Sequence, residues 1–252
     1  MYTQIEKNGN INILKINRPP VNAINLQMVL EITDHLKDLK TNTTVSGVIL
    51  TGVDGYFSAG LDVIDLFPRP EEDIRMFWTK FYDLMQLLYT FPKPLFSAIS
   101  GHSPAGGTVM AIMTDYRLMA MGEFTIGLNE VSVGLVIPQV IAEIFSRLIG
   151  SREAELMALN GSLITPEDAL GIDLVDELCP AEDLLSRSME KMELWLKLPP
   201  IQQMMTKEQF RRKIVKRMLA TRQENLDQLM TIWFSKPFQI AMGNLVENLT
   251  AV

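Results

Sequence analysis

The chain has 252 residues, and its 47% hydrophobic and 21% charged residues are typical of a folded globular protein and exclude a disordered one. A net charge of −7 argues against nucleic-acid binding, and the single cysteine, Cys179, excludes a disulfide framework and a cysteine-based zinc site. No apolar run reaches about 18 residues, so no membrane span is expected. Strand-like sequence begins almost at residue 1, so we expect a cytoplasmic protein unless a mitochondrial or peroxisomal targeting segment precedes this sequence.

Strands and helices alternate in the first half of the chain. Apolar residues recur at helical spacing in residues 25–39, whereas residues 45–51 and 95–99 are short β-rich runs typical of buried strands. The elements expected before Pro138 are a β-hairpin at 2–17, a helix at 25–39, a strand at 45–51, a helix at 71–88, a strand at 95–99, a helix from about 106 to 113, and strands at 116–119 and 124–126.

Helical patterns dominate after Pro138. The elements expected here are helices at 140–148, 153–159, 166–170, 181–196 and 207–234, with one strand at 174–178. We therefore predict an α/β core over residues 1–195 and a helical C-terminal region over residues 196–252. The apolar faces of that region pack either on another subunit or back on the core, and the sequence leaves both open. The basic run from Arg211 to Arg217 is interpreted as a solvated helix face, with phosphate binding as the alternative.

Several common catalytic signatures are missing from the chain. There is no GxSxG nucleophile motif, no Walker loop and no GxGxxG fingerprint. Neither His35 nor His102 has a second histidine or a cysteine nearby, so no metal site is predicted. The remaining possibility is chemistry carried out by a carboxylate and backbone hydrogen-bond donors.

Two glycine-containing turns follow predicted strands, at Phe57-Ser58-Ala59-Gly60-Leu61-Asp62 and at Pro104-Ala105-Gly106-Gly107. Small residues let a backbone approach a ligand closely, and each turn precedes a helix-like segment with unpaired N–H groups. Two such groups that converge would form an oxyanion hole, in which one donor typically contributes about 3–4 kcal/mol to transition-state stabilisation. Each turn alone is weak evidence, because glycine after a strand is more often an ordinary tight turn.

Glu130 stands among apolar residues and glycines, in Ile126-Gly127-Leu128-Asn129-Glu130. Burial would raise the pKa of its carboxyl toward that of a general base usable at neutral pH. The alternative is a structural carboxylate that caps or hydrogen-bonds the backbone.

Taken in this order, the three motifs resemble the crotonase (enoyl-CoA hydratase/isomerase) superfamily. Further segments that carry the resemblance are Asn17-Arg18-Pro19-Pro20-Val21-Asn22-Ala23, Lys93-Pro94, Thr114-Asp115-Tyr116-Arg117 and Ala169-Leu170-Gly171-Ile172-Asp173-Leu174-Val175-Asp176. The resemblance implies an α/β fold, a crotonase-like spiral of repeated ββα units with a helical C-terminal trimerisation region. It also implies a homotrimer or a dimer of trimers.

The resemblance implies roles for individual residues. The backbone N–H groups of Leu61 and Gly106 would form the oxyanion hole, and Glu130 would be the catalytic base. The substrate-binding residues would be Ala59, Gly60, Asp62, Val63 and Asn129. The segment from 59 to 63 would border the adenine and pantetheine arm of coenzyme A, with Pro20 and Val21 lining the same arm.

One departure from the family pattern indicates the reaction. Hydratases of this family use two glutamates to hold and split water, and the first falls where this chain has Val109. Valine cannot accept a hydrogen bond from water, whereas one carboxylate suffices for a 1,3-proton shift. Asn129-Glu130 and Ser58-Ala59-Gly60-Leu61-Asp62 resemble the mitochondrial-type Δ3,Δ2-enoyl-CoA isomerases in particular, which also have an apolar residue at the Val109 position. This resemblance implies that no metal or separate cofactor is needed, because coenzyme A is part of the substrate.

Other functions of the superfamily stay open. The alternatives are a thioester hydrolase, a decarboxylase, a weak hydratase, and a non-catalytic scaffold or RNA-binding relative, the last disfavoured by the acidic pI and by Glu130. The residues considered for the acyl pocket, each also suited to ordinary core packing, are Leu66, Phe67, Trp78, Leu135, Ile137, Trp233 and Phe234.

Overall fold

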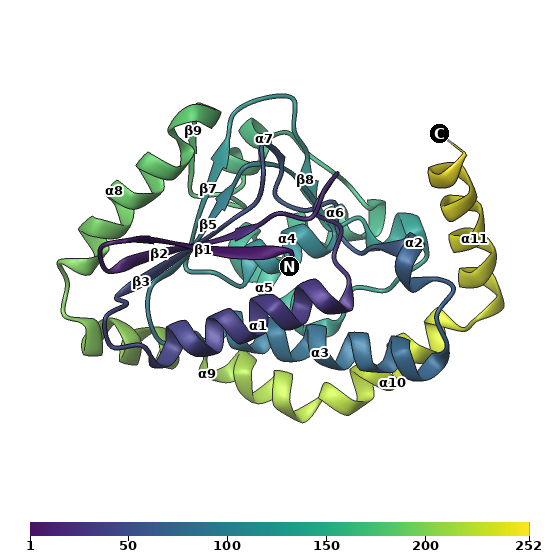
Figure 1. Ribbon diagram of the computed structural model, residues 1–252. Coiled ribbons are helices and arrows are strands. Elements are labelled where there is room, and N and C mark those ends of the chain that lie inside the picture. Colours follow the sequence, from purple (N-terminus) through teal and green to yellow (C-terminus); the bar gives the residue numbers. More distant parts are fainter. Residues whose placement is uncertain (252) are drawn as a thin grey trace.

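The computed structural model describes residues 1–251, and a six-stranded sheet of order β1-β2-β3-β5-β7-β9 runs through its core (Figure 1). The first two strands are antiparallel, and every later neighbouring pair is parallel. The strands are β1 (Thr3–Asn8), β2 (Ile11–Ile16), β3 (Gly47–Thr51), β5 (Leu95–Ile99), β7 (Tyr116–Ala120) and β9 (Glu177–Cys179). β3 and β5 are buried along their whole length, as is typical of central strands in a parallel sheet.

A three-stranded parallel sheet of order β4-β6-β8 accompanies the large one. Its strands are β4 (Gly55–Tyr56), β6 (Gly101–Pro104) and β8 (Ile126–Gly127). Each comes a few residues after a strand of the large sheet, namely β3, β5 and β7, and helices follow each pair. The repeated unit is strand, strand, helix, and the expected spiral of ββα units is confirmed.

Helices cover the sheets and form the whole C-terminal part of the chain (Figure 1). Their bounds are α1 (Leu26–Thr41), α2 (Val63–Leu66), α3 (Glu71–Tyr89), α4 (Gly106–Ile112), η1 (Glu130–Val133), α5 (Gln139–Ile149), α6 (Ser151–Asn160), α7 (Pro166–Gly171), η2 (Ala181–Asp183), α8 (Leu184–Leu196), α9 (Pro200–Ala220), α10 (Arg222–Trp233) and α11 (Lys236–Thr250). Among the described residues, none of the helices combines the length and apolarity that a membrane span requires.

Two predicted strands differ from the structure. Phe124 lies outside β8, because its N–H bonds to the carbonyl of Gly122 within a turn. Leu174 and Val175 lie outside β9, because their N–H groups return to the carbonyl of Ala169 at the end of α7. In both places the backbone N–H groups already form local hydrogen bonds in a turn, so they are not available to extend the strand.

The C-terminal region contains more helices than predicted. The single helix expected at 207–234 is wrong: α9 begins earlier, and Thr221 (φ −100°, ψ 3°) separates it from α10, which lies along α3 (Figure 1). The helix α11 was not predicted, although Ser235 caps the N–H of Phe238 and a proline stands in its first turn. The division into 1–195 and 196–252 stays a prediction, and Val252 lies outside the described residues.

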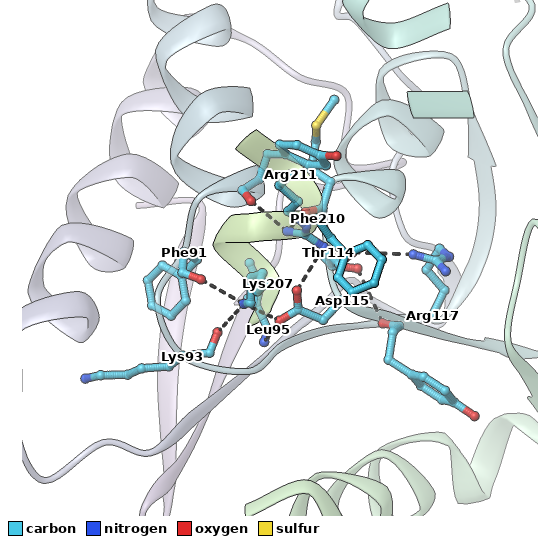
Figure 2. Close-up of polar contacts among 12 residues, drawn as sticks. Phe91, Lys93, Leu95, Thr114, Asp115, Arg117, Lys207, Phe210 and Arg211 are labelled. Atoms are coloured by element: carbon cyan, nitrogen blue, oxygen red, sulfur yellow. Dashed lines mark hydrogen bonds and ion pairs between the residues drawn. The ribbon is translucent and has the colours of Figure 1, made fainter. Parts of the chain in front are cut away.

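Ion pairs join α9 to the core (Figure 2). Lys207 Nζ lies 2.6 Å and Arg211 Nη2 lies 2.9 Å from the carboxylate of Asp115, whose side chain is 5% exposed. Arg211 also donates to the carbonyl of Tyr89 at 2.6 Å. The interpretation of the basic run as a solvated face is therefore wrong for Arg211, whose side chain is only 14% exposed and is paired with Asp115, the residue just before β7. It holds for the other basic residues of the run, Arg212, Lys213, Lys216 and Arg217, which are exposed.

Candidate active site

The three segments of the candidate site follow the carboxyl ends of the three strands of the small sheet. β4 leads into the first glycine-containing turn, β6 into the second, and β8 into Glu130. Phe57 N–H donates to the carbonyl of His102 at 3.0 Å, and Ala105 N–H donates to the carbonyl of Gly127 at 2.9 Å. Because the strands are parallel, the three loops leave the sheet on the same side and meet there.

A parallel β-bridge to the segment before α1 fixes the first loop. Ile24 N–H donates to the Gly60 carbonyl at 2.7 Å, and Asp62 N–H donates to the Ile24 carbonyl at 2.9 Å. The Gly60 carbonyl and the Leu61 N–H belong to one trans peptide plane and point in opposite directions. Since the carbonyl points at Ile24, the Leu61 N–H points away from it. Gly60 has φ +84°, which only glycine adopts without strain.

A sharp turn at Ala105 fixes the second loop. Its φ of +45° and ψ of −115° are rare for a residue with a Cβ. The Ala105 carbonyl accepts a hydrogen bond from Val109 N–H at 2.9 Å, so it points along α4. The Gly106 N–H, in the same peptide plane, therefore points out of the helix end. Within residues 1–251, neither this N–H nor that of Leu61 donates a hydrogen bond.

The two loops are packed against each other. A Cβ added to Gly60 would lie 3.2 Å from Pro104 O and 3.5 Å from Gly106 N. One added to Gly106 would lie 3.7 Å from the carbonyl carbon of Gly60, the atom bonded to Leu61 N. The two unpaired donors are thus close neighbours, an arrangement suited to stabilising charge on a single oxygen atom.

A cavity of about 400 Å³ is lined by both donors and by Glu130. All residues assigned to the site from the sequence line this cavity except Gly60. Of the two residues expected beside the coenzyme A arm, Val21 lines the cavity and Pro20 does not. The predicted lining residues are Val21, Ala59, Leu61, Asp62, Val63, Gly106, Asn129 and Glu130. Residues far apart in the chain are therefore brought together as the three motifs require.

Glu130 begins the 3-10 helix η1, and its backbone carbonyl accepts a hydrogen bond from Leu135 N–H at 2.9 Å. Its carboxyl oxygen Oε2 is buried and has no hydrogen-bond partner within residues 1–251. Removal from water disfavours the charged form, and this desolvation raises the pKa of Glu130 from 4.5 to about 7. The carboxyl is therefore poised to accept and return a proton near neutral pH.

The acyl-pocket predictions are only partly right. Trp78 and Leu135 line the cavity, whereas the other five candidates do not. Those five are Leu66 and Trp233 in the core, Phe67 and Ile137 packed against it, and Phe234 at the surface. The sequence interpretation missed the lining residues Ile64, Phe81, Met85, Ile141, Leu229, Leu245 and Leu249. Phe81 and Met85 follow Trp78 at helical spacing, so the periodicity of α3 could have indicated them.

Val109 also faces the cavity, from the first turns of α4, and is 5% exposed. The cavity is thus lined by a valine, a glutamate and two unpaired N–H groups, a set suited to proton transfer next to a carbonyl group. Within residues 1–251, no group of three or more His, Cys, Asp and Glu side chains could hold a metal ion.

Solved structures with the same architecture define the class of protein. The crystal structure of human mitochondrial Δ3,Δ2-enoyl-CoA isomerase matches with a TM-score of 0.96 and 29% identity, covering 100% of this chain and 99% of that one. An enoyl-CoA hydratase from Bacillus halodurans matches with a TM-score of 0.89 and 18% identity, covering 97% of this chain and 100% of that one. The fold is that of the crotonases.

Sequence comparison gives the family. The family model described as enoyl-CoA hydratase/isomerase matches residues 6–250. Mitochondrial enoyl-CoA delta isomerase 1 from mouse (Mus musculus) is 35% identical over 238 residues, which cover 94% of this chain and 82% of the relative. The chain belongs to the enoyl-CoA hydratase/isomerase family.

Proposed function

We propose that the protein is an enoyl-CoA isomerase that converts 3-enoyl-CoA to 2-trans-enoyl-CoA in fatty-acid β-oxidation. The observation that carries this proposal is the carboxyl of Glu130: among residues 1–251 it is the one carboxyl in the cavity lining with an unpartnered buried oxygen, and Val109 stands where the hydratases have a second acid. The isomerase names of the mouse relative and of the human structure support it.

The reaction is a proton shift along the acyl chain. The thioester oxygen accepts hydrogen bonds from the N–H groups of Leu61 and Gly106, and the carboxylate of Glu130 removes a proton from C2. The resulting dienolate carries its charge on that oxygen, where the two preorganised donors stabilise it. Glu130 then returns the proton to C4, and the double bond ends in conjugation with the thioester.

The proposal is tested by supplying 3-enoyl-CoA and following the ultraviolet absorbance of the conjugated product. We expect absorbance to rise without release of free thiol. Thiol release would indicate a hydrolase, and loss of carbon dioxide from a carboxyacyl-CoA would indicate a decarboxylase. Either result, without isomerisation, would overturn the proposal.

Hydration is expected to be slow. Addition of water to 2-enoyl-CoA needs a second group that holds the water, and Val109 offers no hydrogen-bond acceptor. We predict a hydration rate at least about 100-fold below the isomerisation rate, the lower range of general acid–base contributions. Loss of the conjugated-enoyl absorbance measures hydration, and a rate comparable to isomerisation would reveal an acid–base group beyond Glu130.

The pH dependence of the reaction should report Glu130. The base acts only when ionised, and its pKa is raised to about 7 by desolvation. We therefore expect kcat/KM to rise about tenfold per pH unit below 7 and to level off above it. A profile that stays flat down to about pH 5 would point to a base with the pKa of an ordinary exposed carboxylate.

Coenzyme A enters as part of the substrate, and no further cofactor is part of the proposal.

We propose a homotrimer or a dimer of trimers, supported by large apolar side chains left exposed on α9, among them Ile201, Met205 and Phe210. Sedimentation equilibrium measures the mass, and a monomer would contradict this assembly.

The cytoplasmic location stays a prediction; the mouse relative is named as mitochondrial.

A further inference from the structure

Arg18 lies beside the bridge that orients Leu61, in the segment between β2 and α1. Its Nη1 donates to the Ala23 carbonyl at 2.8 Å, and its Nη2 donates to Asp62 Oδ2 at 2.5 Å. The guanidinium also lies over the ring of Tyr2, with 5.2 Å between Cζ and the ring centroid. The side chain is 19% exposed and is therefore held largely within the protein.

The two groups that Arg18 joins stand on the two sides of the bridge. Ala23 precedes Ile24 on one side, and Asp62 follows Leu61 on the other. The second carboxylate oxygen of Asp62 accepts the N–H of Asp65 at 2.9 Å and so begins α2. Arg18 thus holds two segments together: the loop that carries the Leu61 N–H and the segment that contains Ile24. The Leu61 N–H points away from the Ile24 segment.

We infer that Arg18 is a positioning residue for the oxyanion hole, and this inference rests on the proposed function. Arg18 does not itself line the cavity, but both of its hydrogen-bond partners, Ala23 and Asp62, do. It therefore acts on the oxyanion hole through these partners and the peptide plane of Gly60 and Leu61. The planar fork of arginine can hold a carbonyl and a carboxylate at once, whereas lysine offers a point charge on a flexible stem. Arg18→Lys therefore keeps the charge and loosens the bridge.

The test compares Arg18→Lys with Arg117→Lys. Arg117 is a matched control, because it too joins a carbonyl, that of Leu174 at 3.0 Å, to a carboxylate, that of Asp176 at 2.7 Å. It lies on β7 and does not line the cavity. We expect Arg18→Lys to lower kcat about 10- to 100-fold with little change in KM, as for a misplaced transition-state donor.

A spectroscopic measurement separates positioning from stability. In the Glu130→Gln background, which prevents turnover, the infrared carbonyl stretch of bound 2-enoyl-CoA reports hydrogen bonding to the thioester oxygen. Arg18→Lys should reduce its shift on binding, whereas Arg117→Lys should leave it unchanged. In the background with Glu130 intact, the pH profile should keep its inflection near 7.

Unchanged kcat and carbonyl shift in Arg18→Lys would overturn the inference, as would equal losses in both lysine variants. If Arg18→Lys does not fold, Asp62→Asn provides the test, because asparagine keeps an acceptor for the Asp65 N–H and loses the charge that pairs with Arg18. The inference and the proposed function can fail separately. If Arg18→Lys reduces the carbonyl shift of bound 2-enoyl-CoA but the wild type does not isomerise 3-enoyl-CoA, the proposed function is refuted and the inference stands.

Discussion

Replacing Glu130 by glutamine should lower kcat for 3-enoyl-CoA isomerisation by about 10³- to 10⁴-fold, the upper range for general-base catalysis. The other carboxylate in the cavity lining, Asp62, is engaged by Arg18 and by the N–H of Asp65, so it cannot take over. Glutamine preserves the shape of the side chain, so affinity for an acyl-CoA product should change little. Steady-state kinetics and calorimetric titration measure the two quantities.

The same variant should be at least as stable as the wild type. Burial raises the pKa of Glu130 from 4.5 to about 7, so the folded protein holds a proton that the unfolded chain releases between these values. Wild-type stability therefore falls as pH rises through this window, and Glu130→Gln removes that loss. We expect it to gain about 1–3 kcal/mol above pH 7 and little below pH 4.5.

Denaturant unfolding at both pH values measures that difference. The exposed Glu153→Gln on α6 serves as the control: its activity should be unchanged, and it should lose at most about 1 kcal/mol, because it removes a negative charge from the first turn of the helix. An active Glu130→Gln would remove Glu130 from the mechanism. An inactive but destabilised variant would mean that its carboxylate has a structural role.

Gly60→Ala should lower kcat about 100-fold. At φ +84° an alanine is strained, and its Cβ would press on Pro104 O at 3.2 Å and approach Gly106 N at 3.5 Å. The loops can relieve this contact only by moving apart, which separates the donors of Leu61 and Gly106. A displacement of about 1 Å at a catalytic group can cost about 10²-fold in rate.

Gly150→Ala is the matched control for backbone strain. Gly150 has φ +86°, and a Cβ added there would meet nothing within 4 Å. Both variants should lose comparable stability from the backbone, but only Gly60→Ala should lose activity. Kinetics together with thermal unfolding make the comparison, and equal rates for the two variants would show that the packing of the loops does not position the donors.

The sequence indicated the chemical groups of the site but not how they are aimed. Glycines after strands and a glutamate among apolar residues are visible locally, and the resemblance to the crotonases implied which of these residues, Leu61, Gly106 and Glu130, form the site. The direction of the Leu61 N–H depends on a bridge to Ile24, a long-range contact that no local pattern specifies. The backbone turn at Ala105 was likewise hidden, because alanine gives no signal for a positive φ.

The lining residues that come from the C-terminal helices were not predicted, for a related reason. Leu245 and Leu249 come from α11, which was not recognised, and Leu229 comes from α10, whose separation from α9 at Thr221 carries neither glycine nor proline. The burial of Arg211 also depends on a distant partner, Asp115. Helix packing and ion pairs between remote segments are decided by tertiary structure rather than by periodicity.

A crystal structure of Glu130→Gln with bound 3-enoyl-CoA is the most direct test of the proposed mechanism. The thioester oxygen should lie about 2.7–3.1 Å from both Leu61 N and Gly106 N, as in an oxyanion hole. The side chain at position 130 should lie within about 3.5 Å of C2 and reach C4 on the same face of the acyl chain. A thioester oxygen bound elsewhere, or a side chain at position 130 turned away from these carbons, would contradict the mechanism.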